Sequence, residues 1–295
     1  QQLIITPFNH GGSRDADPFK VVDLAPEPSF AEQYGERIAF LDTYLKADDP
    51  APLNRQIRYY TMVEDVWKTT DVWPPKGFET ERWYFGENNS LTTAAPVRGF
   101  AQDSYKVDFS ATTGVHNRWL ANLGGGRDIV YPDRSEEDAK LLVYDTPALT
   151  QDMEITGVPV VTLQVESTHE DGAFHVYLED VAPNGRVTYI TEGILQAKHR
   201  KVSEDTPPFY TGGPYHSFKA ADAESLIVGK VSEIKIGLIN TSVLIKAGHR
   251  LRVAVAGHDA SVFERVPAKG TPTITLHRNR NAVSYIDLPV MRRQH

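Results

Sequence analysis

The chain has 295 residues, of which 40% are hydrophobic and 24% charged, as in a globular protein of one large or two ordinary domains. Its net charge is −8 and its pI about 5.7, so the clustered Lys and Arg of a nucleic-acid-binding protein are not expected. It contains no cysteine, which excludes disulfides, cysteine-based zinc sites and a thiol nucleophile, and no apolar run approaches the roughly 18 residues of a membrane helix. We therefore expect neither a nucleic-acid nor a membrane partner.

A short apolar run opens the chain. Leu3, Ile4 and Ile5 follow two glutamines, and such a run is typical of a buried parallel strand. It ends at Pro7, and a loop rich in Gly and Asp continues to Asp17. A strand-like run this close to the first residue predicts that upstream sequence has been removed by processing or design.

One helix is predicted after this loop. Ser29 followed by Glu32 forms a capping box, in which the hydroxyl and the carboxylate satisfy free backbone N–H groups. The helical spacing of apolar residues is lost at residues 47–50, where the helix is predicted to end. The residues that recur at helical spacing and give it one apolar face are Phe30, Tyr34, Ile38, Leu41 and Leu45.

From residue 55 the pattern changes to period two, which predicts strands. The first covers residues 57–63, and an aromatic, proline-rich connecting segment with Trp67, Trp73 and Pro74-Pro75 follows it. We place a domain boundary at the end of this segment, between residues 1–75 and 76–295.

The second predicted domain consists of short alternating segments separated by turns, a pattern typical of a β-sandwich or barrel. Asn184-Gly185 predicts a hairpin turn, because both residues tolerate a positive φ. The chain is therefore predicted to be mainly β. Its clearest predicted strands cover residues 161–166, 174–180, 187–194, 251–255, 273–276 and 286–288.

His10 is the first candidate for chemistry. It lies on the loop after a predicted parallel strand, where open α/β sheets place their sites. In α/β-hydrolases the triad order is Ser, then Asp or Glu, then His, and no G-x-S-x-G motif occurs in this chain. A catalytic His10 would thus need a Ser and an acid from elsewhere. The alternative, a histidine that only makes local hydrogen bonds, is favoured by spacing alone.

Other groups have simpler interpretations. His258, Asp259 and Ser261 are too close in sequence for a triad and predict a polar loop at a strand end. His169 and the two acidic residues after it predict a solvated loop rather than a metal site. No EF-hand or H-E-x-x-H spacing occurs, so no metal or cofactor is expected.

Four indoles raise a second functional hypothesis, a non-enzymatic module that binds carbohydrate or protein. Sugars stack on exposed indoles, but large aromatic rings more often bury in cores and interfaces, which is the favoured interpretation here. These residues are Trp67, Trp73, Trp83 and Trp119.

An ordered set of segments resembles the CocE/NonD serine hydrolases, which include cocaine esterase, α-amino acid ester hydrolases and X-Pro dipeptidyl-peptidases. Pro7-Phe8-Asn9-His10-Gly11 resembles the family's G-P-W-x-H segment, with Phe8 in place of Trp and Thr6 in place of Gly. The other matching segments are residues 37–46, 57–75, 144–157, 180–193, 247–251 and 284–289.

The resemblance implies a C-terminal jelly-roll β-sandwich, preceded by the terminal strand and helix of an α/β-hydrolase core. It implies that His10 is the catalytic general base and acid, acting with a Ser and an Asp supplied by upstream sequence. The implied partners are the missing N-terminal part of the same hydrolase and a small ester or amide substrate, with no cofactor. The jelly roll would form one wall of the substrate cleft, around residues 123–127. A homo-oligomer is neither supported nor excluded.

Overall fold

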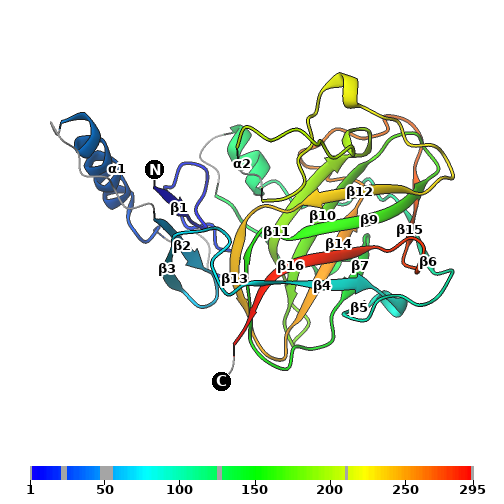
Figure 1. The fold of residues 1–295 in the computed structure, drawn as a ribbon, viewed down its shortest axis with the longest axis horizontal. Coiled ribbons are helices and arrows are strands. Elements are labelled where there is room, and N and C mark those ends of the chain that lie inside the picture. The colour runs from blue at the N-terminus through cyan, green and yellow to red at the C-terminus, as the bar shows by residue number, and fades with distance from the viewer. Residues whose placement is uncertain (1, 21–24, 47–55, 125–127, 210–211, 294–295) are drawn as a thin grey trace.

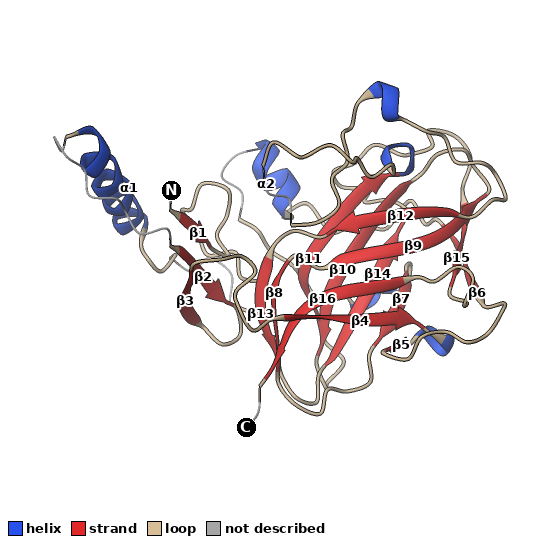
Figure 2. Cartoon of the chain, viewed as in Figure 1, coloured by secondary structure: helices blue, strands red, loops and turns tan. Residues whose placement is uncertain are grey.

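The computed structural model of the chain describes residues 2–20, 25–46, 56–124, 128–209 and 212–293 (Figure 1). Strands dominate this part of the chain, and the few helices lie outside the sheets (Figure 2). The predicted mainly β class is confirmed. Within the described ranges, no helix combines the length and the apolar character needed to cross a bilayer.

A small sheet forms the N-terminal part. It consists of β1 (Leu3–Ile5), β2 (Ile57–Thr61) and β3 (Val66–Thr70), with β1 parallel and β3 antiparallel to β2. The predicted parallel strand is confirmed, but it is not buried: Leu3 is 49% and Ile4 41% exposed. The reason is that β1 has β2 as its one neighbour in the described part of the chain.

Helix α1 (Phe30–Leu45) begins at the predicted capping box. The Ser29 backbone N–H donates to Glu32 Oε2 at 2.8 Å, and the Glu32 N–H donates to Ser29 Oγ at 3.3 Å. None of its residues is buried, and Figure 1 shows the helix projecting from the side of the molecule. The predicted end of the helix, residues 47–50, lies outside the described residues. Its exposed apolar side chains are Phe30, Tyr34, Ile38, Leu41, Tyr44 and Leu45.

Two larger sheets pack face to face around one core. In the described chain the smaller sheet has the order β11 (Val187–Gln196), β10 (Ala173–Val181), β14 (Arg250–Ala256) and β7 (Leu142–Asp145). The larger has the order β13 (Thr241–Ile245), β8 (Met153–Gly157), β16 (Tyr285–Arg292), β9 (Val160–Ser167), β15 (Thr273–His277) and β6 (Gln102–Lys106). Three further strands extend the larger sheet, namely β12 (Ser232–Gly237) on β9, β4 (Glu79–Phe85) on β16, and β5 (Leu91–Thr92) on β4.

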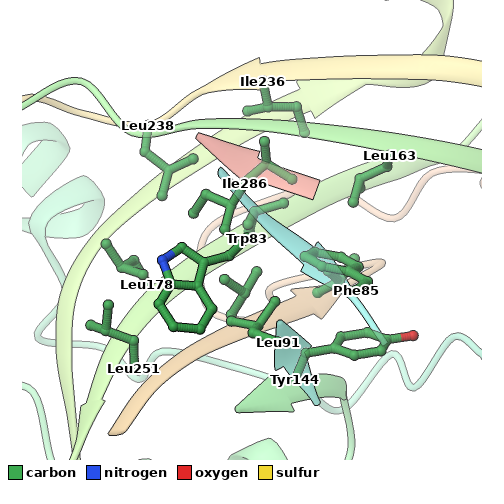
Figure 3. Close-up of a cluster of buried hydrophobic side chains, with 14 of the residues drawn as sticks. Trp83, Phe85, Leu91, Tyr144, Leu163, Leu178, Ile236, Leu238, Leu251 and Ile286 are labelled. Carbon is green, nitrogen blue, oxygen red and sulfur yellow. The ribbon is translucent and has the colours of Figure 1, made fainter. Parts of the chain in front are cut away.

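Aromatic and aliphatic side chains from both sheets fill the space between them. Figure 3 shows Trp83 of β4 beside Leu178 of β10 and Leu251 of β14, with Phe85 of the same strand near Tyr144, and all of these side chains are buried. The Phe85 ring stacks on that of Tyr144 with 4.5 Å between centroids. Burial of an aromatic or leucine side chain contributes about 1.5–3 kcal/mol, so this core is the main source of stability.

The predicted strands after residue 160 are all present, and so is the hairpin turn. Gly185 has a φ of +90°, and its N–H donates to the Ala182 carbonyl at 2.9 Å between β10 and β11.

The outer face of the smaller sheet is buried as well. Every residue of β10 is buried, including His175, Tyr177 and Glu179, whose side chains alternate with those of the core. The covering segment, here called the 107–141 segment, consists of the described residues 107–124 and 128–141 and contains α2 (Arg118–Gly124) and α3 (Ser135–Asp138). Its Tyr131 ring stacks on Tyr189 at 3.9 Å.

The small sheet joins the larger one through a backbone bridge. The Met62 N–H donates to the Ser242 carbonyl at 2.9 Å, and the Leu244 N–H donates to the Met62 carbonyl at 3.0 Å. The Thr61 and Ser242 hydroxyls hydrogen-bond at 2.9 Å beside this bridge. The N-terminal segment is therefore held in a defined position against the β domain.

Candidate functional site

The loop after β1 folds into a tight turn with His10 at its tip. The Asn9 N–H donates to the Arg14 carbonyl at 3.1 Å. Asn9 Oδ1 accepts from the backbone N–H groups of Ser13 at 2.9 Å and Arg14 at 3.3 Å. Asn9 thus closes the turn from within and fixes the backbone on both sides of His10.

Two neighbours hold this turn from outside. Gln33 of α1 donates to the Gly12 carbonyl at 2.9 Å, and Gly12 has a φ of +70°, which favours glycine. A Cβ at Gly12 would lie 2.6 Å from Gln33 Oε1, so a larger residue would push this amide away from the turn. On the other side, Arg14 forms an ion pair with Asp128 of the β domain at 3.2 Å. The turn is therefore anchored to both parts of the chain.

His10 is exposed at the rim of a cleft of about 1270 Å³. Within the described residues its ring makes no hydrogen bond, so the local bond that the alternative interpretation requires is not found there. Residues of β1, β2 and the His10 turn line one side of the cleft, and residues of α2 and β11 line the other. This volume is somewhat larger than the roughly 300–1,000 Å³ of a typical small-molecule site, so the cleft has room for such a ligand.

The β-domain wall of this cleft is largely aromatic and apolar. Tyr131 and Tyr189 form a stacked pair there, and Ile129 and Ile190 lie beside them. Burial raises the pKa of both tyrosines, so their phenols stay neutral at pH 7. The wall therefore suits an apolar or aromatic group on a bound molecule.

The expected wall at residues 123–127 falls largely on residues of which the structure gives no description. Residues 125–127 are outside the described part of the chain, whereas Arg118 and Asn122 of α2 line the cleft. Sequence reasoning missed Tyr131 and Tyr189 because they come from distant segments without a local motif.

A buried carboxyl group lies at the base of the His10 loop. The Asp17 side chain is fully buried, its Oδ1 accepts from the Phe19 N–H at 2.9 Å, and its Oδ2 has no hydrogen-bond partner in the described residues. The Lys20 ammonium lies 4.0 Å away and donates instead to the Tyr60 hydroxyl at 2.6 Å and to Asp15 at 3.3 Å. Burial raises the pKa of Asp17 from 3.8 to about 6.

This raised pKa predicts a pH-dependent stability. The folded chain holds the Asp17 proton more tightly than the unfolded chain, so Asp17 lowers stability progressively as the pH rises from 3.8 to about 6. Asp17→Asn keeps the acceptor for Phe19 and removes the charge. We expect it to raise the free energy of unfolding by about 1–3 kcal/mol at pH 8 and to change it little at pH 4. Urea unfolding at both pH values tests this, and an equal effect at both would contradict it.

The structure agrees with the polar-loop interpretation of residues 258–261. Asp259 accepts from the backbone N–H groups of Thr113 and Ser261, each at 3.2 Å. The His258 ring packs on Phe109 at 5.2 Å and makes no hydrogen bond to Asp259 or Ser261. Asp259 therefore fixes the covering segment and does not form a triad.

The loop at His169 has a structural role. Asp171 accepts from the backbone N–H groups of Gly172 at 2.9 Å and Lys198 at 3.2 Å, while His169 lies 3.0 Å from the Thr168 hydroxyl. Across the described ranges, no group of three or more His, Asp and Glu side chains is arranged to hold a metal ion.

The indoles make contacts inside the protein. Trp83 is buried in the core, and Trp119 packs on Phe263 at 5.8 Å. Trp73 packs on Tyr59 at 5.4 Å and donates to Asn240 Oδ1 at 2.8 Å, so it lies where the two parts of the chain meet.

Comparison with known families decides the classification. Residues 51–287 match the family described as the X-Pro dipeptidyl-peptidase C-terminal non-catalytic domain. The chain belongs to this family. The X-Pro dipeptidyl-peptidase C-terminal domain thus includes both large sheets, whereas His10, β1 and α1 precede the matched span.

Individual relatives align with nearly the whole chain, including the part before residue 51. The chain is 42% identical to a predicted serine esterase of Mycobacterium bovis, over 98% of this chain and 45% of that protein. It is 23% identical to the cocaine esterase of a Rhodococcus species, over 99% of this chain and 52% of that protein. The resemblance to the C-terminal portion of the CocE/NonD hydrolases is confirmed, and the chain spans about half the length of these relatives.

A solved structure shares the fold. An α-amino acid ester hydrolase aligns over 99% of this chain and 50% of its own, with a TM-score of 0.74 and 20% identity. That structure therefore contains counterparts of both the X-Pro dipeptidyl-peptidase C-terminal domain and the N-terminal segment.

Proposed function

We propose that this chain is the C-terminal part of a CocE/NonD-type serine hydrolase, here called the full hydrolase, that cleaves ester or amide bonds of small acyl or aminoacyl substrates. The position of His10 carries this proposal: it follows a parallel strand, lies at the tip of a braced turn, and faces a cleft of about 1270 Å³. The 42% identity to a predicted serine esterase supports it.

In this proposal His10 is the general base and acid of an acyl-enzyme mechanism. It takes the proton from a Ser hydroxyl as that oxygen attacks the carbonyl carbon, and it returns the proton to the leaving group. A water then repeats the sequence to release the acid. The Ser, and the Asp that would orient the imidazole, are supplied by sequence upstream of this chain.

The uncovered apolar surface of the N-terminal segment supports a partner of this kind. Within the described residues β1 has one unpaired edge, and α1 exposes Tyr34, Ile38 and Leu41 on one face. A parallel sheet normally has helices on both of its faces. We propose that β1 and α1 are the last strand and helix of the α/β-hydrolase core, that the division near residue 75 separates this core from a jelly roll, and that the upstream part covers them.

Covalent labelling tests the proposed function. A fluorophosphonate probe reacts with the activated Ser of serine hydrolases. With the full hydrolase, peptide mass mapping should find the probe on a Ser upstream of Gln1, and the purified chain alone should neither be labelled nor hydrolyse 4-nitrophenyl butyrate. Labelling within residues 1–295, or hydrolysis by the chain alone that His10→Ala leaves unchanged, would overturn the proposal.

The proposed docking of α1 predicts a context-dependent mutation. Ile38 is 55% exposed in this chain, so Ile38→Ala should change its free energy of unfolding by less than about 0.5 kcal/mol. In the full hydrolase the same side chain would be buried against the core, and its truncation should cost about 2–4 kcal/mol. Thermal unfolding of both proteins measures this, with Lys46→Ala as the exposed control. Equal effects in the two proteins would show that nothing covers α1.

A further inference from the structure

One cation in the cleft forms no ion pair within the described part of the chain. Of the described residues that line the cleft, two are permanently charged near neutral pH, Asp71 and Arg118. Asp71 is paired with Lys76 at 3.2 Å. Arg118 forms no ion pair with any described residue, and its Nε is buried without a hydrogen-bond partner.

Arg118 is held firmly at this position. Asn117, which is buried, accepts from the Leu120 N–H at 2.9 Å and so caps the start of α2. The Asn117 amide donates to the Thr113 hydroxyl at 2.9 Å, and Asp259 in turn accepts from the Thr113 N–H at 3.2 Å. The start of α2 is therefore tied to the end of β14, and the Arg118 side chain is presented by a fixed backbone.

The surroundings of Arg118 favour an anion joined to an apolar group. Its backbone N–H donates to the Tyr131 hydroxyl at 3.3 Å, which places it beside the stacked Tyr131–Tyr189 pair. The buried acid Glu192 interacts electrostatically with Arg118, and burial raises its pKa to about 7, so it is only partly ionised at neutral pH. A guanidinium with unused donors in a partly apolar cleft is a strong carboxylate-binding group.

We propose that Arg118 is a specificity-determining residue that binds a carboxylate carried by the acyl or leaving part of the substrate, while the apolar body of that part lies on the Tyr131 wall. This inference rests on the proposed function, because only a hydrolase of that kind would have a substrate in this cleft. The preferred class would be an ester or amide with a free carboxylate beyond an apolar or aromatic spacer, rather than a neutral or cationic ester.

Binding to the chain itself tests the inference without requiring hydrolysis. The probes are 4-phenylbutyrate and its neutral amide, 4-phenylbutyramide, titrated by ligand-detected NMR at pH 7. We expect the carboxylate to bind at least about ten-fold tighter than the amide, because a charge-assisted hydrogen bond separates them. Arg118→Gln should reduce this ratio to less than about two-fold, and Arg118→Lys should restore part of it.

A second variant keeps the test decisive if Arg118→Gln disturbs folding. Asn122 is exposed, lines the cleft and lies one helical turn from Arg118, so Asn122→Asp should pair with Arg118 and lower carboxylate affinity selectively. Asn122→Ala is the matched control and should leave the ratio unchanged. Equal affinities for the two probes, or a ratio that survives both Arg118→Gln and Asn122→Asp, would overturn the inference. These binding measurements do not depend on hydrolysis. A negative result would therefore overturn the Arg118 inference alone, whereas failure of the fluorophosphonate test would overturn the proposed function.

Discussion

His10→Ala in the full hydrolase should lower kcat/KM for 4-nitrophenyl butyrate by about 10⁴-fold or more, because the Ser hydroxyl then has no base and the leaving group no acid. The turn should survive the change, since Asn9 closes it through backbone groups and the His10 ring makes no hydrogen bond in the described chain. Substrate affinity should therefore change much less than kcat. Steady-state kinetics with a circular-dichroism comparison of the two proteins measure both effects.

A matched histidine serves as the control for this variant. His199 packs on Phe218 at 5.4 Å and does not line the cleft, so His199→Ala should keep kcat/KM within about two-fold of the parent value, as surface changes usually do. A His10→Ala protein that folds and retains activity within ten-fold of the parent would contradict the assignment. The base would then have to be another residue.

Arg134→Met should lower the free energy of unfolding of the chain by about 3–5 kcal/mol, because it leaves an acid without its partner deep in the protein. Arg134 donates from Nε to Glu179 Oε1 at 2.9 Å, and Glu179 is fully buried. Burial raises the pKa of Glu179 and the Arg134 charge opposes this shift, so removal of Arg134 drives the carboxyl further toward its neutral form. Without Arg134 the carboxyl must stay protonated or the covering segment must lift from the sheet.

Two comparisons isolate this effect. Arg98 pairs with Glu87 at the surface, so Arg98→Met should change stability by less than about 1 kcal/mol. Adding Glu179→Gln to Arg134→Met should recover part of the loss, since the unpaired acid is removed. Urea unfolding at pH 7 measures all four proteins. Equal losses for Arg134→Met and Arg98→Met would show that the buried pair does not hold the covering segment.

The Arg134–Glu179 pair also helps to position the start of α2, which lines the cleft. Arg134 also donates to the Thr112 carbonyl at 3.1 Å, next to Thr113, which anchors Asn117 at the start of α2. We therefore expect Arg134→Met to weaken carboxylate binding at Arg118 under conditions where the chain remains folded.

Local chemistry explains what the sequence could predict. The capping box at Ser29 and the turn at Gly185 depend on residues a few positions apart, and both are present as expected. The strands could also be predicted, because alternating apolar and polar residues indicate a strand with one face in the core. The position of His10 after a parallel strand follows from the order of a short run and a loop.

Long-range packing explains what could not be predicted. Alternation in β10 identifies the core face but does not reveal that the 107–141 segment buries His175 and Glu179 on the other face. The cleft wall joins Tyr131 to Tyr189 from separate segments, and no spacing rule connects them. The apolar run at Leu3 predicts burial, yet Leu3 and Ile4 are exposed in the described structure.

A crystal structure of the full hydrolase would test the central claim most directly. The distance to measure joins a ring nitrogen of His10 to the Oγ of the Ser that fluorophosphonate labels. The account predicts about 2.6–3.2 Å, the range of a nucleophile–base hydrogen bond, with α1 buried beneath the upstream core. A labelled Ser whose Oγ hydrogen-bonds to a different histidine, with His10 remote from it, would contradict the account.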